Sequence, residues 1–213
     1  KVPDTLADEA ACLAEPISCA INSQEIAGVK AGDRVLIVGG GPLGAIEAEV
    51  AKANGASKVM IVQRSEPRLS LLRRLKDVIV IDGSQDVLKR VQEETDGLGA
   101  DVAIVCAPER TPQEQSINYV RKGGVVSLFA SLPQGASDLR LDSRVIHYRE
   151  LRVVGSSDSR AEHVQKAIDL LASGKIDATG IVTHRFGLSR FHEGIDVMKQ
   201  KQGLKVVIIP EKR

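Results

Sequence analysis

Aromatic residues are scarce in this chain: they make up 2% of its 213 residues, and there is no tryptophan. Proteins that bind single-stranded nucleic acid stack bases on aromatic side chains, so the chain has few such platforms. Its net charge is +1, from 29 basic and 28 acidic residues, which leaves no bulk positive field to gather nucleic acid or anionic lipid. We therefore expect neither nucleic acid nor a membrane as a partner.

Cysteines and long apolar runs are equally few. The three cysteines, Cys12, Cys19 and Cys106, form no C-x-x-C pair. A sparse and odd set of this kind indicates a reducing compartment without a disulfide framework. No stretch approaches the roughly 18 apolar residues of a membrane span, and the first residues lack a signal-peptide core. These absences predict a cytoplasmic protein.

What the sequence does contain is a regular alternation of apolar strand runs with helical patterns. We expect strands at 34–38, 58–62, 78–81, 101–106, 124–129 and 151–154, with helices near 43–54, 66–76, 84–95, 111–121 and 142–149. Runs such as Val-Leu-Ile-Val are continuously apolar, as in strands covered on both faces. The predicted fold class is α/β, with a doubly wound, six-stranded parallel sheet of the Rossmann type.

Segments on either side of this core have a different pattern. The N-terminal part predicts a helix from Asp4 to Ala14, an interruption at Glu15-Pro16, and a second helix to about Ala27. After Gly155 we expect helices and strands in alternation, at 160–173, 181–186, 188–201 and 204–209. These last residues are too few for an independent core, so we expect them to pack on another part of the protein.

A glycine-rich turn directly follows the first predicted strand. Residues 39–44 read Gly-Gly-Gly-Pro-Leu-Gly and contain the pattern G-x-G-x-x-G. The first glycine makes the tight turn, the second allows the backbone to approach a pyrophosphate, and the third lets helix and strand pack closely. The phosphates would lie on the amide groups where the next helix begins. The predicted cofactor-binding residues here are Gly39, Gly41, Pro42, Leu43 and Gly44.

The end of the second predicted strand suggests which dinucleotide would bind. NAD-binding folds usually place a carboxylate there for the ribose hydroxyls, but this chain reads Gln63-Arg64-Ser65. Arg64 offers a planar fork for a 2′-phosphate, Ser65 offers its hydroxyl or its amide, and Arg68 lies one turn further on. These residues favour NADP. The alternative is a solvated basic helix start, with Gln63 bonding both ribose hydroxyls of NAD.

Residues after the later strands are expected at the same edge of the sheet. Cys106 and Ala107, after the fourth strand, would border the adenine. Phe129 and Ala130, after the fifth, and Ser156, after the sixth, would flank the nicotinamide. The small side chains of Cys106 and Ala107 leave room for a purine, but such residues are also ordinary at strand ends.

Several segments in the right order resemble a known family. They are Ala-Glu-Pro-Ile-Ser-Cys-Ala at 14–20, Val-Lys-Ala-Gly-Asp-Arg-Val at 29–35, Thr-Asp-Gly-Leu-Gly-Ala-Asp-Val at 95–102, Val-Thr-His-Arg-Phe at 182–186 and Gly-Leu-Lys-Val-Val-Ile at 203–208. With the glycine turn, they resemble the coenzyme-binding half of medium-chain, zinc-type alcohol dehydrogenases. The sorbitol (polyol) and threonine dehydrogenase branch is the most similar.

The resemblance implies a zinc-dependent oxidoreductase that passes hydride between a secondary alcohol of a polyol-like substrate and NADP or NAD. Family members begin with a GroES-like catalytic domain that this sequence lacks, so the chain is expected to be a fragment that starts just before the junction. The implied division is a junction segment at 1–18, a dinucleotide-binding domain at 19–156 and a return segment at 157–213. We expect cofactor binding without catalysis, and no catalytic residue in this chain.

Two further residues take a role from the resemblance alone. Glu15 would lie at the catalytic zinc of the intact enzyme, as a ligand or behind its water; zinc itself is not expected in the isolated chain. Lys205 would approach the pyrophosphate from the C-terminal segment. The alternatives are a helix-terminal glutamate before Pro16 and a lysine at a strand edge.

A different class of function stays open at this point. The chain would also suit a non-catalytic NADP-binding sensor or interaction module that pairs with a separate catalytic chain. In either case we expect a homo-oligomer, because the sixth predicted strand leaves an open sheet edge that needs cover.

Overall fold

Six parallel strands form the central sheet of the computed structural model, which describes residues 1–210. They are β1 (Arg34–Val38), β2 (Lys58–Gln63), β3 (Ile79–Asp82), β4 (Ala100–Val105), β5 (Val120–Leu128) and β6 (Arg152–Gly155). Their order in the sheet is β3-β2-β1-β4-β5-β6. The chain winds outward in both directions from β1 and β4, which creates a crevice between their carboxyl ends. The predicted doubly wound sheet is confirmed.

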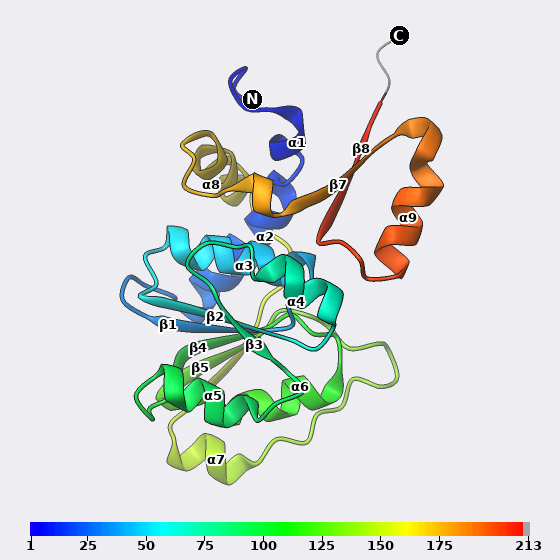
Figure 1. The fold of residues 1–213 in the computed structure, drawn as a ribbon. Helices are drawn as coiled ribbons and strands as arrows, with labels where there is room; N and C mark the ends of the chain where they lie inside the picture. The colour runs from blue at the N-terminus through cyan, green and yellow to red at the C-terminus, as the bar shows by residue number, and fades with distance from the viewer. Residues whose placement is uncertain (211–213) are drawn as a thin grey trace.

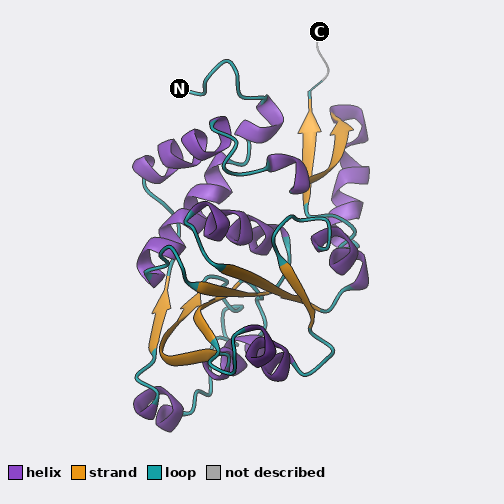
Figure 2. Cartoon of the chain, turned by 60° about the vertical axis from the view of Figure 1, so that its left-hand side comes forward, coloured by secondary structure: helices purple, strands orange, loops and turns teal. Residues whose placement is uncertain are grey.

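Helices cover both faces of this sheet (Figure 1). One layer holds α2 (Ala14–Ala27), α3 (Pro42–Ala53) and α4 (Glu66–Leu72), and the other holds α5 (Val87–Glu94), α6 (Arg110–Gln115) and α7 (Ser143–Tyr148). Figure 2 shows the strands between these two layers. Side chains of β1 alternate accordingly: Val35 and Ile37 belong to the core under α3, and Leu36 and Val38 to the core on the opposite face. Two-sided burial is therefore the reason for the continuously apolar strands.

The fifth strand is longer than the sequence predicts. It begins at Val120 rather than at Gly124, and its register against β4 shifts between Ala100 and Val102. Gly123 has a φ of 70°, and a Cβ on Gly124 would lie 2.8 Å from the carbonyl oxygen of Arg121. The two glycines thus form an irregularity inside the strand instead of a break before it.

The N-terminal helices also differ from expectation. The first, α1, covers only Asp8–Ala11, and α2 begins at Ala14 and contains Glu15 and Pro16 in its first turn. A proline in the first turn removes an amide that has no helical partner in any case, so it starts a helix as readily as it ends one. The Glu-Pro pair therefore opens α2 rather than separating two helices.

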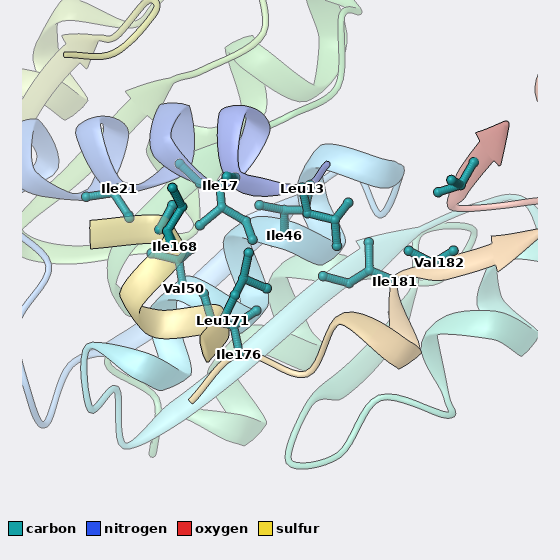
Figure 3. Close-up of a cluster of buried hydrophobic side chains, with 14 residues drawn as sticks. Leu13, Ile17, Ile21, Ile46, Val50, Ile168, Leu171, Ile176, Ile181 and Val182 are labelled. Atoms are coloured by element: carbon teal, nitrogen blue, oxygen red, sulfur yellow. The ribbon is translucent and has the colours of Figure 1, made fainter. Parts of the chain in front are cut away.

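The C-terminal part packs on the N-terminal helices. It contains α8 (Ala161–Ala172), β7 (Val182–Gly187), α9 (Phe191–Lys199) and β8 (Lys205–Ile209), and β7 and β8 form a two-stranded parallel sheet. Figure 3 shows one cluster of buried side chains that joins Leu13 and Ile17 of the N-terminal part, Ile46 of α3 and Leu171 of α8. The expectation that residues after Gly155 pack on another part of the protein is confirmed. The three-part division of the chain stays a prediction.

Candidate functional site

Two adjoining cavities open at the carboxyl edge of the central sheet. The first, the glycine-loop cavity, has a volume of about 570 Å³ and is lined by residues that follow β1, β2 and β4. The second, the Glu15 cavity, has a volume of about 750 Å³ and is lined by residues of α2 and by residues that follow β5 and β6. Leu43 lines both cavities. A long ligand that occupied both would thus pass Leu43 at the start of α3.

Most of the predicted cofactor residues line these cavities. The glycine-loop cavity contains Gly39, Gly41, Pro42, Leu43, Gly44, Gln63, Arg64, Ser65, Arg68, Cys106 and Ala107. The Glu15 cavity contains Glu15, Leu43, Phe129, Ala130 and Ser156. Lys205 is the exception: it lies in β8, where its charge acts on Cys12. Lys201, which the sequence reasoning did not select, lines the glycine-loop cavity instead.

Three positions of the loop carry glycine for different steric reasons. Gly39 has a φ of 111°, and a Cβ there would lie 2.7 Å from the backbone nitrogen of Ala107. A Cβ on Gly44 would lie 2.1 Å from the carbonyl oxygen of Gly39. For Gly41, in contrast, the nearest protein atom to a Cβ is the Arg68 Nη1 at 3.6 Å, an ordinary contact. Packing within the chain therefore demands the first and last glycine, whereas the middle one leaves space for a ligand.

Arg68 places a positive charge against this loop. Its guanidinium lies beside Gly41, and its Nε is buried without a hydrogen-bond partner within residues 1–210. Burial lowers the pKa of Arg68 from its usual value, but a guanidinium titrates so high that the side chain stays charged. A half-buried cation with an unsatisfied donor at the edge of a cavity is suited to an anionic group of a ligand.

The turn after β2 is ordered by Gln63, the last residue of that strand. The Oε1 of Gln63 accepts hydrogen bonds from the backbone amides of Arg64 at 2.7 Å and of Ser65 at 3.0 Å. The Ser65 amide, which we expected to donate to a phosphate, is thus already satisfied, and the Ser65 hydroxyl is the donor that remains. Gln63 likewise has its carboxamide oxygen engaged within the turn, which leaves its amide nitrogen for a ligand.

Arg64 has a partner that the sequence reasoning missed. Its Nη2 lies 2.5 Å from Oε2 of Glu109, and the two side chains are 61% and 52% exposed. Glu109 follows β4 and Arg64 follows β2, and these strands lie on either side of β1. The sequence does contain a signal for this ion pair. β2 and β4 end at the same edge of the sheet, and each is followed closely by a charged residue of opposite sign.

Cys106 and Ala107 close the cavity on the β4 side. Their amides donate to the carbonyl oxygen of Val38, at 2.8 Å and 3.0 Å, which holds the end of β4 against the end of β1. Burial, and to a smaller degree the neighbouring charge of Glu47, raises the pKa of the Cys106 thiol well above its usual range. Cys106 is therefore a neutral wall residue, not a reactive thiolate.

Glu15 and Cys19 face each other one turn apart on α2. The Cys19 thiol donates to Glu15 Oε1 at 3.5 Å, and both residues line the Glu15 cavity with Phe129, Ala130 and Ser156. Burial and then the Glu15 carboxylate raise the pKa of Cys19. No group of three or more metal-ligating side chains occurs in the described part of the chain. Because a protein zinc site needs three or four such ligands, these residues alone do not fit a zinc ion.

A glycine loop at the switch point of a doubly wound sheet, with a cation beside it, is the arrangement of a Rossmann dinucleotide-binding domain. The chain belongs to the zinc-binding dehydrogenase family, whose family model matches residues 42–173. That match corresponds to the NAD-binding half of these enzymes. Members of the family are oxidoreductases that bind NAD(P) and zinc. The predicted resemblance is confirmed.

Three similar proteins illustrate the relationship. An L-threonine 3-dehydrogenase from Bacillus licheniformis is 32% identical over 213 residues, which cover 99% of this chain and 60% of that protein. A sorbitol dehydrogenase from Halalkalibacterium halodurans is 28% identical and is matched over 98% of this chain and 61% of its own length. A solved structure from Sinorhizobium meliloti 1021, described as a zinc-binding dehydrogenase bound to NADP, superimposes with a TM-score of 0.86 at 29% identity, over 98% of this chain and 61% of that one. The chain thus spans about 60% of the length of the relatives it matches.

Within residues 1–210, no helix combines the length and the apolar character that a membrane crossing requires.

Proposed function

We propose that this chain is the coenzyme-binding portion of a zinc-dependent dehydrogenase that passes hydride between a secondary alcohol and a nicotinamide dinucleotide. The observation that carries the proposal is the glycine loop, in which Gly41 leaves open the space that a pyrophosphate would occupy. The substrate class is that of the relatives' names, a polyol or a hydroxy-amino acid. The isolated chain is proposed to bind cofactor without catalysing the reaction.

The preferred cofactor is proposed to be NADP. Gln63 stands at the end of β2 in place of a carboxylate, and the charged residues that line the cavity include three cations, Arg64, Arg68 and Lys201. A 2′-phosphate is better accommodated by Gln63 and Arg64 at this position than by an acid that binds ribose hydroxyls. The NADP-bound structure from Sinorhizobium meliloti 1021 adds support from a relative.

In this proposal the two cavities divide the dinucleotide between them. The adenosine would lie in the glycine-loop cavity against Cys106 and Ala107, and the pyrophosphate beside Gly41 and Arg68, on the first amides of α3. The nicotinamide would pass Leu43 into the Glu15 cavity. Phe129 and Ala130 would then hold the ring so that one face points toward Glu15 and the substrate.

Zinc, when bound in the intact enzyme, supplies a Lewis acid for the substrate oxygen. In this chain Glu15 is the residue proposed to lie at that ion. Its contribution would be one carboxylate at the wall between cofactor and substrate, with Cys19 as its hydrogen-bond donor.

Calorimetric titration of the chain with NADPH and with NADH tests the proposal. NADPH binding at least about tenfold tighter than NADH, a difference of about 1.4 kcal/mol, is the expected result. Equal or NADH-favoured binding would remove the NADP assignment and keep the dinucleotide site. Failure to bind either would overturn the proposed function. An assay with sorbitol and with threonine, with zinc added, is expected to show no turnover by the isolated chain.

A non-catalytic NADP sensor or interaction module is the second candidate. The observation in its favour is that the described residues bring together no more than two metal-ligating side chains at Glu15. Mixing this chain with a separate catalytic chain distinguishes the two candidates. Alcohol dehydrogenase activity that appears only in the mixture would support the module, whereas a coenzyme-binding half that works only within one polypeptide would give none.

We also infer that copies of the chain associate through β6. It is the last strand of the sheet, and its Val153 is 36% exposed. An open strand edge with an exposed apolar side chain invites pairing with another strand. Sedimentation of the wild type and of Val153→Lys tests this: a dimer that dissociates in the variant is expected, and a monomeric wild type would refute it.

A further inference from the structure

We propose that Glu109 is a specificity-determining residue, which holds Arg64 and thereby limits how tightly the chain binds a 2′-phosphorylated adenosine. The proposal rests on the proposed function, because it concerns the same adenosine site. It assigns a role to a residue that neither the glycine motif nor the end of β2 contains.

Glu109 is the carboxylate of the glycine-loop cavity. Among the described residues that line this cavity, the other charged side chains are Arg64, Arg68 and Lys201, all of them cations. The 2.5 Å contact between Arg64 Nη2 and Glu109 Oε2 pairs one cation and leaves the other two for a ligand. Glu109 thus neutralises the cation that directly follows Gln63 at the end of β2.

Backbone features on both sides hold this pair in place. Glu109 follows Pro108, whose ring fixes its own φ, and it occupies the N-cap position of α6 with extended dihedrals, φ −130° and ψ 143°. On the other side, a Cβ on Gly83 would lie 2.8 Å from Cγ of Arg64, so the glycine lets the arginine stem lie close to the backbone. The two side chains meet because the ends of β2 and β4 flank the end of β1.

The negative charge of Glu109 is expected to lower the affinity for a 2′-phosphate. A 2′-phosphate that binds Arg64 must displace Glu109 or accept its negative charge nearby, and a like charge at short range is unfavourable. NAD carries hydroxyls at this position and does not meet this repulsion. Because both side chains are more than half exposed, the ion pair is weak enough for a phosphate to compete with it. Glu109 therefore narrows the preference for NADP without abolishing it.

The test compares two fragments that differ only in the 2′-phosphate, 2′,5′-ADP and 5′-AMP, together with NADPH and NADH. Glu109→Gln keeps the shape of the side chain and removes its charge. This substitution is expected to raise the binding affinity for 2′,5′-ADP and for NADPH by about three- to tenfold. The affinities for 5′-AMP and NADH are expected to change less than about twofold, because neither ligand carries the phosphate that the carboxylate repels.

Two further variants make the result specific. In an Arg64→Ala background, Glu109→Gln is expected to give a clearly smaller gain, since the arginine that it releases is absent and only the repulsion between carboxylate and phosphate is relieved. Glu66→Gln is the matched control: Glu66 pairs with Arg73 at 3.1 Å and is 67% exposed, but does not line the cavity. It removes the same charge and is expected to leave all four affinities unchanged.

Other outcomes overturn the inference in distinguishable ways. Three results for Glu109→Gln would contradict the role of Glu109: unchanged or weaker 2′,5′-ADP binding, an equal gain in affinity for 5′-AMP, or the same gain in the absence of Arg64. In each case, binding by the wild type would still support the dinucleotide site. A wild-type chain that binds none of the four ligands would instead refute the proposed function, and the inference with it.

Discussion

The carbonyl oxygen of Gly39 fills the space where Gly44 would carry a side chain: a Cβ at Gly44 would lie 2.1 Å from it. The obstacle is backbone rather than a flexible side chain, so a substituted residue cannot push it aside cheaply. Gly44→Ala is therefore expected to lower the free energy of unfolding by about 1–3 kcal/mol and to abolish dinucleotide binding. Urea unfolding followed by circular dichroism measures the first effect, and calorimetry the second.

Gly41→Ala is expected to behave differently. Gly41 has a φ of −84°, and a Cβ there would make only an ordinary contact of 3.6 Å with Arg68. Stability should thus change by less than about 1 kcal/mol. Binding of both NADPH and NADH should weaken by more than about tenfold, because the new methyl group occupies the space proposed for the pyrophosphate. A stable variant that binds normally would place the ligand elsewhere.

The two arginines after β2 are predicted to act on different parts of the cofactor. Arg68 lies beside Gly41, so Arg68→Ala should weaken NADPH and NADH alike. Arg64 directly follows Gln63, at the end of β2 where the adenosine ribose would lie, so Arg64→Ala should weaken NADPH more than NADH, by about threefold or more. Titrations of both variants with NADPH and with NADH measure how much affinity each variant loses for each cofactor. Equal losses in Arg64→Ala would contradict its assignment to the 2′-phosphate.

Glu47 is predicted to make the protein less stable as the pH rises. Burial raises the pKa of this carboxyl from its usual 4.5 to about 8, although Gln24 and Ser23 hydrogen-bond to it and oppose the shift. The folded state thus binds the proton more tightly than the unfolded state. The contribution to stability is complete below about pH 4.5 and is lost progressively up to about pH 8.

Glu47→Gln tests this because its amide stays neutral at every pH. The free energy of unfolding of the variant, relative to that of the wild type, should rise between pH 5 and 8 by up to about 5 kcal/mol, and the difference should level off above that range. Urea unfolding at pH 5, 7 and 9 measures it, with the exposed Glu66→Gln as control. Parallel stability curves for wild type and Glu47→Gln would show that Glu47 ionises normally.

Asp101 is predicted to have the opposite dependence. Burial acts to raise its pKa, but hydrogen bonds from Arg34 and Arg121 outweigh it and lower the pKa from 3.8 to about 2. Asp101 therefore stabilises the fold above about pH 4, and this contribution is lost as the pH falls toward 2. Asp101→Asn should be less stable than the wild type by roughly 2 kcal/mol at pH 7, a gap that closes in acid. Acid-titrated unfolding curves measure this; a gap that is constant with pH would assign the loss to packing.

Much of the fold could be predicted from local patterns. The first strand is predicted at 34–38 and lies at Arg34–Val38, because an apolar run that ends in glycines has few other conformations. Errors arose where one residue type permits two structures. Pro16 starts a helix instead of interrupting one, and the glycine pair before residue 125 bends a strand instead of preceding it. Helices such as α4 end earlier than predicted, at Leu72, since their periodicity continues beyond the last helical hydrogen bonds.

The sequence by itself determined the elements, the glycine loop and the family resemblance, because each depends on residues that are neighbours along the chain. Only the tertiary structure decided which distant groups meet. Strand order brought Glu109 to Arg64 across 45 positions. The packing of the C-terminal part placed Lys201 rather than Lys205 at the cavity. The packing of α2 against α3 buried Glu47 against Gln24, on a helix whose sequence gives no sign that this carboxyl is inside. Such contacts follow from the packing of sheet edge and helix layers, which no local periodicity encodes.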